Sequence, residues 1–406
     1  MKILLLSTEE FSGAGKATDK IKCALSKLNI TCDHKVLFKN KKNLNLNDKI
    51  RILIYKLKIK FYSFMGKVSG KNRNDFQSLS MFPTNLSNEI NKSDYDIIHL
   101  TWINELLNIE DIGRIKKPIV WTLCDMWPIA GINHYESYNL DTFWRFKNFT
   151  TFNFKKFDLD KWIINRKIKS WKNKIIFVSP SQWLYDCAKD SVISNKFQIE
   201  KISWPIDKNI FSKLDKTKMR NRYNLPINKK IILFNSFSGI YSKRKGSDLF
   251  FNALKRTKLE FDVLIIGNHL DKNIDNQIHH KIHWMGRFDN EFKLAELINC
   301  ADLLVLPSRM DNLPQTGLEA QACGLPVVAF NTNGIKDLID HKIDGYLSKP
   351  FDVDSLKDGI EWTINELNLS SKLSTNSLKK SKEKWDSNIV AKKYKNLYQE
   401  ILNPIK

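Results

Sequence analysis

Short apolar runs alternate with amphipathic segments along the whole chain. In the first half, an apolar run at Lys2–Ser7 is followed by a helical pattern from about Lys16 to Leu28. Such runs, separated by helical patterns, predict buried strands of a parallel sheet with helices on both faces. The strands expected in this half are Lys2–Ser7, Cys32–Leu37, Tyr95–Leu100, Pro118–Leu123 and Lys174–Val178.

The second half repeats this alternation, which predicts two doubly wound α/β domains in series. Its expected strands are Ile231–Asn235, Phe261–Ile266, Ile282–Met285, Leu303–Leu306 and Val327–Phe330, and its expected helices are Ser247–Arg256 and Glu291–Asn299. A strand ends at Trp204-Pro205, where proline prevents its continuation. We therefore expect domains at residues 1–203 and 204–384. A final helix, 385–406, has one apolar face and is expected to return to the first domain.

Composition and charge narrow the class of protein. Hydrophobic residues make up 42% of the 406 residues, which is enough for full cores. The net charge of +22 favours anionic partners, although a general abundance of Asn, Lys and Ile would explain it equally well. No helix-turn-helix, zinc-finger or RNP-like motif is visible, so nucleic acid is not an expected partner. The scattered cysteines and the absence of a signal peptide or long apolar stretch predict a cytoplasmic protein.

The segment Asp48–Lys71, DKIRILIYKLKIKFYSFMGKVSGK, interleaves cations with aliphatic and aromatic residues. As a helix it is cationic on one side and apolar on the other, which suits peripheral contact with an anionic membrane. The alternative is an ordinary crossover helix packed on the sheet. The membrane hypothesis places the protein at the inner face of the cytoplasmic membrane.

The segment Asp302–Phe330, DLLVLPSRMDNLPQTGLEAQACGLPVVAF, carries the most informative pattern. An apolar strand ends at Pro307, a loop with Asp311 follows, and a helix with Glu319 begins after Pro314. Ligands of open α/β sheets bind beyond the carboxyl ends of the strands, and helix N-termini bind phosphate. The two acids therefore predict hydroxyl-binding carboxylates beside a phosphate-binding end, as a sugar nucleotide requires. Alternatively, they are a turn residue and a helix-dipole acid.

Two glycine-containing loops also indicate anion binding. Lys245-Gly246 ends the basic loop SKRKG before a helix, where an ammonium, helix-start amides and Arg244 would hold a diphosphate. Gly13 and Gly15 open the first helix and permit close approach of a sugar or phosphate. The alternatives are a solvated basic loop and a tight strand–helix turn.

An aromatic and polar loop follows the strand that ends near Leu123. The segment Trp121–Tyr135, WTLCDMWPIAGINHY, contains acids and rings of the kind that line sugar pockets. The predicted acceptor-binding residues are Asp125, Trp127, His134 and Tyr135. A structural role for His134 is the alternative.

These motifs resemble the retaining GT-B glycosyltransferases of family 4 over nearly the whole chain. The match is strongest at Gly286–Asp289, Asp302–Ser308 and Asp311–Phe330. SGAGKA, the aromatic loop and MDNLPQTGLEAQACGLPVV look most like the subgroup that builds colanic acid, O-antigen and capsule repeat units. The resemblance implies two Rossmann-like domains facing across a cleft. It also implies transfer of a hexose from a UDP- or GDP-sugar with retention, without metal or cofactor.

The resemblance assigns roles to residues by position. Glu319 would bind the donor ribose, Asp311 the sugar hydroxyls and Lys245 the diphosphate, so these three are the catalytic candidates. The other expected donor contacts are Gly13, Gly15, Arg244, Asn312, Leu313, Gln315 and Thr316, with Arg287 and Phe288 near the nucleobase. The first domain would bind a saccharide acceptor, expected to be lipid-linked, in surface polysaccharide biosynthesis.

Three positions depart from the family pattern. The first acid is usually Glu and here is Asp311, and Cys124 stands where many members have His. The usual Gly-Arg after the first strand of the second domain is not evident near Asn235–Gly239. Two other functions remain open, a sugar-nucleotide epimerase of the same fold and a non-catalytic donor-binding protein. The aromatic loop and the basic segment favour an enzyme that uses an acceptor.

Overall fold

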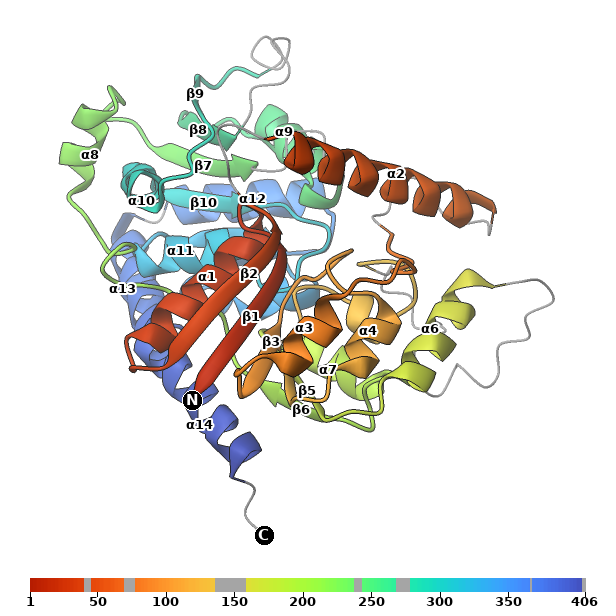
Figure 1. Ribbon diagram of the computed structural model, residues 1–406. Coiled ribbons are helices and arrows are strands. Elements are labelled where there is room, and N and C mark those ends of the chain that lie inside the picture. The colour runs from red at the N-terminus through yellow and green to blue at the C-terminus, as the bar shows by residue number, and fades with distance from the viewer. Residues whose placement is uncertain are drawn as a thin grey trace. The chain divides into compact units, whose positions relative to one another are not determined.

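The computed structural model describes residues 1–39, 45–68, 77–135, 158–236, 243–267, 278–365 and 367–403. The chain divides into two compact units, Met1–Ser203 with Ala391–Lys406, and Trp204–Val390. Each unit contains a six-stranded parallel sheet (Figure 1). The predicted class of two Rossmann-like α/β domains is confirmed.

The sheet of the first unit has the strand order β2-β1-β3-β4-β5-β6. Its strands are β1 (Lys2–Glu9), β2 (Thr31–Phe38), β3 (Ile97–Leu100), β4 (Ile119–Thr122), β5 (Ile175–Ser179) and β6 (Gln198–Lys201). Its helical segments are α1 (Gly13–Ser26), α2 (Leu46–Val68), α3 (Leu86–Lys92), α4 (Ile109–Arg114), η1 (Trp127–Ile129), α6 (Leu159–Ser170), α7 (Gln182–Asp190) and most of α14 (Ser387–Leu402).

The sheet of the second unit has the strand order β12-β11-β10-β7-β8-β9. Its strands are β7 (Ile231–Ser236), β8 (Asp262–Gly267), β9 (Ile282–Gly286), β10 (Leu303–Leu306), β11 (Val327–Phe330) and β12 (Gly345–Ser348). Its helical segments are α8 (Lys216–Arg222), η2 (Lys243–Lys245), α9 (Ser247–Arg256), α10 (Glu291–Cys300), α11 (Gln315–Ala322), η4 (Asn333–Asp337), α12 (Val353–Asn365) and α13 (Leu367–Lys384).

The strand expected to end at Trp204-Pro205 is β6, which already ends at Lys201, whereas the edge strand β12 was not predicted. In β6 only Ile199 is buried, and in β12 the buried positions are Gly345 and Ser348. Neither buried residue of β12 is a large apolar one, so the hydrophobic signal of this strand is weak. Helix α1 also begins earlier than predicted, because the Ser12 hydroxyl caps it by accepting a hydrogen bond from the Gly15 amide at 3.2 Å.

The last helix returns to the first unit, as its apolar face predicts. The Tyr398 hydroxyl lies 2.6 Å from Nδ1 of His99 in β3. Nε2 of His99 lies 2.8 Å from the Thr122 hydroxyl, which in turn lies 2.9 Å from the Tyr394 hydroxyl. All four side chains are buried. This chain of hydrogen bonds anchors α14 to β3 and β4.

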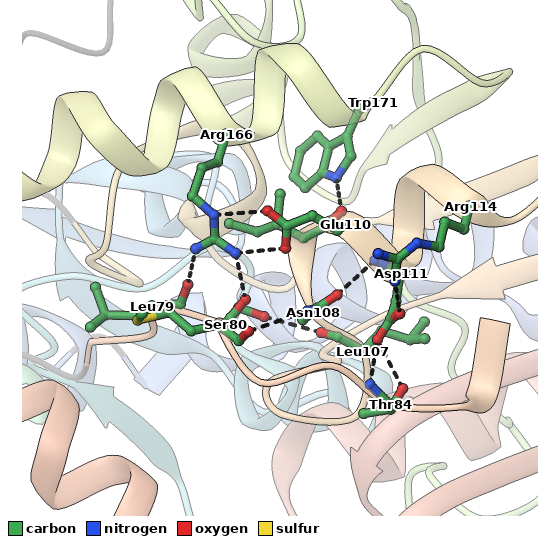
Figure 2. A network of polar contacts seen from close by, with 12 residues as sticks. Leu79, Ser80, Thr84, Leu107, Asn108, Glu110, Asp111, Arg114, Arg166 and Trp171 are labelled. Carbon is green, nitrogen blue, oxygen red and sulfur yellow. Dashed lines mark hydrogen bonds and ion pairs between the residues drawn. The ribbon is translucent and has the colours of Figure 1, made fainter.

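A second polar network fixes the segment before α3. The Arg166 guanidinium of α6 donates to both oxygens of Glu110 at 2.8 and 2.6 Å and to the carbonyl of Leu79 at 3.0 Å (Figure 2). The buried Asp111 carboxylate accepts from the Thr84 amide at 2.7 Å. These bonds tie residues 79–84 to α4 and α6.

Within the described ranges, none of the helices combines the length and apolarity needed to cross a bilayer.

We predict that His99 makes the first unit less stable in acid. Burial lowers the pKa of His99 from 6.5 to about 3, so between these values only the unfolded chain gains the proton. His99 therefore has no effect on stability above pH 6.5, and lowers it by about 2 kcal/mol at pH 5. Hydrogen exchange of peptides from β3 and α14 at pH 7 and pH 5 measures this loss. His99→Gln should show a smaller pH effect, and an equal effect in both proteins would contradict the prediction.

Candidate functional site

The strand order of the second sheet changes direction at β7. The chain passes from β7 to β8 and β9 on one side and then to β10 on the other side of β7. Ligands of doubly wound sheets bind at such a switch point, beyond the carboxyl ends of the two central strands. The loop with Lys245 follows β7, and the loop with Asp311 follows β10, so both predicted residues lie at this point.

The two loops meet through an ion pair. Nζ of Lys245 lies 2.5 Å from Oδ2 of Asp311. Arg244 approaches the same oxygen at 3.6 Å and donates a hydrogen bond to the carbonyl of Met310 at 3.0 Å. The structure therefore brings the adjacent residues Arg244 and Lys245 to Asp311, which lies more than sixty positions later in the sequence.

Gly246 allows the close approach of these loops. Its φ is +70°, and a Cβ atom there would lie 1.9 Å from the carbonyl oxygen of Pro307 at the end of β10. Both the left-handed backbone and the lack of space exclude a side chain. Glycine at this position thus sets how near Lys245 lies to the end of β10.

The Lys245–Asp311 pair is only partly accessible to solvent. The Asp311 side chain is 12% exposed and that of Lys245 is 26% exposed. Burial lowers the pKa of Lys245, against the opposing effect of Asp311. Burial alone would raise the pKa of Asp311, but Lys245, Arg244 and hydrogen bonds together hold it below 3.8. The site therefore presents a carboxylate beside cationic groups, which suits a ligand with both hydroxyls and phosphate.

Arg309 braces this site and was not foreseen from the sequence. Its guanidinium donates to both oxygens of Asp248 in α9 at 2.7 and 2.6 Å and to the carbonyl of Lys243 at 2.7 Å. Its amide donates to the carbonyl of Arg244 at 2.8 Å, and its own carbonyl accepts from the Asn333 side chain at 3.0 Å. Arg309 thus fixes the loop with Lys245 against the loop after β10. The bracing role of Arg309 could be predicted only from the strand order, since its partners lie far from it in the sequence.

Helix α11 begins directly after the Asp311 loop. Pro314 precedes its first residue, and Glu319 lies buried in its second turn. Asn312 and Leu313 are buried, whereas Gln315 and Thr316 are partly exposed at the helix N-terminus. The predicted positions of these residues relative to the helix start therefore agree with the structure, and their contact with a donor remains a prediction.

The glycine loop of the first unit lies at a comparable switch point. It follows β1, where the strand order passes from β2 on one side to β3 on the other. A Cβ atom at Gly15 would lie 1.8 Å from the Glu9 carbonyl oxygen, so tight packing alone explains this glycine. The space around a Cβ at Gly13 is open within 4 Å. Contact of this loop with a ligand remains a prediction.

The predicted acceptor residues form a largely buried polar cluster. Nδ1 of His134 lies 2.6 Å from Asp125, and Nε2 lies 2.7 Å from the Ser78 hydroxyl. The Trp127 ring stacks on the His134 ring, and its Nε1 donates to the carbonyl of Ser78 at 2.9 Å. Asp125, Trp127 and His134 are at most 6% exposed, and only Tyr135 is partly exposed. These contacts give the cluster a structural role, and acceptor binding remains a prediction.

A serine, a histidine and an aspartate are aligned elsewhere in the first unit. The Ser7 hydroxyl lies 2.8 Å from Nε2 of His34, whose Nδ1 lies 2.7 Å from Asp19. This order is that of a hydrolase triad. However, Ser7 lies within β1 with no exposed surface, so a substrate does not reach its hydroxyl. We interpret the three residues as a structural link between β1, β2 and α1.

The remaining predicted donor residues follow the edge strand β9. Arg287 is exposed and Phe288 is half-buried, directly after Gly286, which has a φ of +74°. Part of the segment Asn235–Gly239, where the family pattern has Gly-Arg, lies outside the described residues.

Structural comparison identifies the architecture. The chain superposes on sucrose-phosphate synthase from Thermosynechococcus elongatus with a TM-score of 0.68 at 15% identity, covering 99% of each chain. It superposes on Anabaena HepE in complex with UDP and glucose with a TM-score of 0.62 at 15% identity, covering 98% of this chain and 100% of that one. The fold is GT-B. At these identities the likeness concerns the fold alone.

Sequence comparison adds a family match for the second unit of this GT-B chain. Residues 215–380, which include Lys245, Asp311 and Glu319, match the family described as Glycosyl transferases group 1. Bacillus anthracis N-acetyl-alpha-D-glucosaminyl L-malate synthase is 24% identical over 48% of this chain and 52% of its own length. Campylobacter jejuni N,N'-diacetylbacillosaminyl-diphospho-undecaprenol alpha-1,3-N-acetylgalactosaminyltransferase is 25% identical over 45% and 48%. The chain thus spans about half of the length of these relatives.

We predict that Arg309→Ala loosens the loop that carries Lys245. The variant loses the forked contact with Asp248 and the bond to the Lys243 carbonyl. Hydrogen exchange of peptides covering η2 and the start of α9 should become about fivefold faster, as expected for a partly exposed ion pair. Arg256→Ala is the matched control, because it removes an exposed pair with Asp354 at the other end of α9. Equal exchange near Lys245 in both variants would show that Arg309 has no bracing role.

Proposed function

We propose that this protein is a retaining, metal-independent glycosyltransferase of family 4. It moves a hexose from a UDP- or GDP-sugar to a saccharide acceptor in surface polysaccharide biosynthesis. The observation that carries the proposal is the Lys245–Asp311 pair, which joins the loop after β7 to the loop before α11 at the switch point of the second sheet. The match to Glycosyl transferases group 1 over the same unit supports it. So does the UDP and glucose bound to HepE, a protein of the same fold.

The donor would bind to the second unit through complementary charges. Lys245, Arg244 and the first amides of α11 present positive charge to a diphosphate, because the N-terminus of a helix favours anions. Asp311 accepts hydrogen bonds from sugar hydroxyls, and Glu319 accepts them from the ribose.

Transfer exchanges one bond of the anomeric carbon for another. The bond from this carbon to the diphosphate oxygen breaks, and a bond to the acceptor oxygen forms on the same face. The acceptor proton passes to the leaving diphosphate. Negative charge grows on that diphosphate in the transition state, and Lys245 and the helix amides stabilise it there. No side chain is required as a covalent nucleophile.

A lipid-linked acceptor agrees with the exposed face of α2 in the first unit. The large apolar side chains on this face are at least 40% exposed and follow one another at helical spacing: Leu46, Ile50, Leu53, Ile54, Leu57, Phe61, Phe64 and Val68. A column of exposed lysines runs beside them: Lys49, Lys56, Lys60 and Lys67. The opposite face packs inward through Tyr62 and Gly66, the buried residues of the helix.

Such a face favours contact with an anionic membrane surface. Apolar side chains insert between the lipids while the lysines attract acidic headgroups, and the net charge of +22 adds to this attraction. A crossover helix packed only on the sheet would not leave this apolar face exposed. The undecaprenol-linked substrate in the name of the Campylobacter relative supports a lipid-linked acceptor.

We predict that Lys245→Ala lowers turnover about 100-fold, because the leaving diphosphate loses one charged donor. A thermal-shift screen with UDP- and GDP-sugars first identifies the donor, and turnover is then measured with that donor and a lipid-linked saccharide. Lys243→Ala removes an exposed lysine from the same 3₁₀ turn and should retain activity. Undiminished turnover in Lys245→Ala would refute the phosphate role. Conversion of the donor without an acceptor would identify an epimerase instead.

We predict that Leu57→Asp combined with Phe64→Asp lowers binding to vesicles of phosphatidylcholine and phosphatidylglycerol about tenfold. These side chains are 56% and 59% exposed, and their apolar surface would be lost from the membrane contact. Cosedimentation measures the bound fraction. Ile227→Asp alters an exposed apolar residue of the second unit and should leave binding unchanged. Equal vesicle binding by the wild type, the double variant and Ile227→Asp would contradict the role of α2.

A further inference from the structure

The partner of Lys245 in this structure is itself an anion. The Asp311 carboxylate lies 2.5 Å from Nζ of Lys245, and Arg244 lies 3.6 Å from the same carboxylate oxygen. On the proposed function, this ammonium binds the diphosphate. Asp311 therefore competes with the diphosphate for Lys245, the cation that both need.

The surrounding contacts hold the backbone of Asp311 in place. Its carbonyl accepts from the Gly334 amide at 3.2 Å, and the preceding Met310 carbonyl accepts from Arg244 at 3.0 Å. Arg309, two residues earlier, is fixed to α9 by its forked bond to Asp248. The loop is thus braced on both sides. A ligand that takes Lys245 removes the charged partner that lies 2.5 Å from Asp311, and a hydroxyl of the ligand at nearly the same place would replace it.

An intact sugar nucleotide offers such a donor, whereas the product does not. The hydroxyls of the sugar can donate to Asp311 while the diphosphate contacts Lys245. A nucleoside diphosphate has no sugar there and carries one more ionisable oxygen on its terminal phosphate. With the product bound, the Asp311 carboxylate faces additional negative charge and lacks a hydroxyl partner.

We propose that Asp311 makes the site discriminate between donor and product. This inference rests on the proposed function and deepens it. With the donor bound, Asp311 accepts hydrogen bonds from the sugar. Once the hexose has left, Asp311 returns to Lys245, repels the nucleoside diphosphate and promotes its release. The Lys245–Asp311 ion pair re-forms after each turnover.

Titration calorimetry with two pairs of probes tests this idea: UDP with UDP-glucose, and GDP with GDP-mannose. The quantity of interest is the ratio of the Kd of the nucleoside diphosphate to the Kd of its sugar ester. In Asp311→Asn the nucleoside diphosphate should bind about tenfold more tightly, since a competing hydrogen-bonded charge is gone. The sugar ester should gain no affinity. The ratio therefore falls at least tenfold.

Two controls separate charge from shape. Asp311→Glu keeps the negative charge and should keep the ratio close to that of the wild type. Asp354→Asn removes an exposed carboxylate of α12 in the same unit and should not change the ratio. Asp311→Ser provides a second neutral variant if the asparagine variant does not fold, and the same fall in the ratio is expected.

The possible failures are distinguishable. An unchanged ratio in the neutral variants, with nucleotides still bound, would overturn the role of Asp311 and leave the proposed function intact. Equal loss of affinity for the nucleoside diphosphate and for its sugar ester in these variants would also overturn the role of Asp311. If the wild-type protein binds neither pair of probes, the proposed function fails, and this inference fails with it.

Discussion

The strand order of the second sheet is the constraint on which the candidate site depends. Because the chain crosses from one side of β7 to the other, the loops after β7 and β10 lie side by side at the carboxyl edge of the sheet. Gly246 lets the first loop pack against the end of β10, and Arg309 fixes both loops to α9. The close contact between Lys245 and Asp311 follows from this packing.

The first unit relies on buried polar networks to position its loops. Arg166 fixes the residues before α3, and Ser78 in the neighbouring stretch lies within hydrogen-bonding distance of His134. Helix α2 joins this unit through the hydroxyl of Tyr62, which donates to the buried Glu105 at 2.8 Å. The opposite face of the same helix is apolar and exposed to solvent. The inward face of α2 is thus fixed by a buried hydrogen bond, whereas its outward face exposes apolar side chains.

Much of the fold could be predicted from local sequence signals. Helix α9 has the bounds that its apolar spacing predicts, and the central strands follow from continuous apolar runs. The edge strand β12 was missed because few of its residues are buried. The candidate site was predicted residue by residue, but its geometry was not. The contact between Lys245 and Asp311 depends on strand order, and Arg309 acts through partners that no local pattern connects to it.

In the proposed function, the Lys245–Asp311 site binds the diphosphate of a sugar nucleotide. A crystal structure of the protein with a bound nucleoside diphosphate tests it most directly. We expect phosphate oxygens within hydrogen-bonding distance of Nζ of Lys245 and of the first amides of α11, and a Lys245–Asp311 distance longer than the 2.5 Å seen here. A nucleotide bound elsewhere, with this ion pair unchanged, would contradict it.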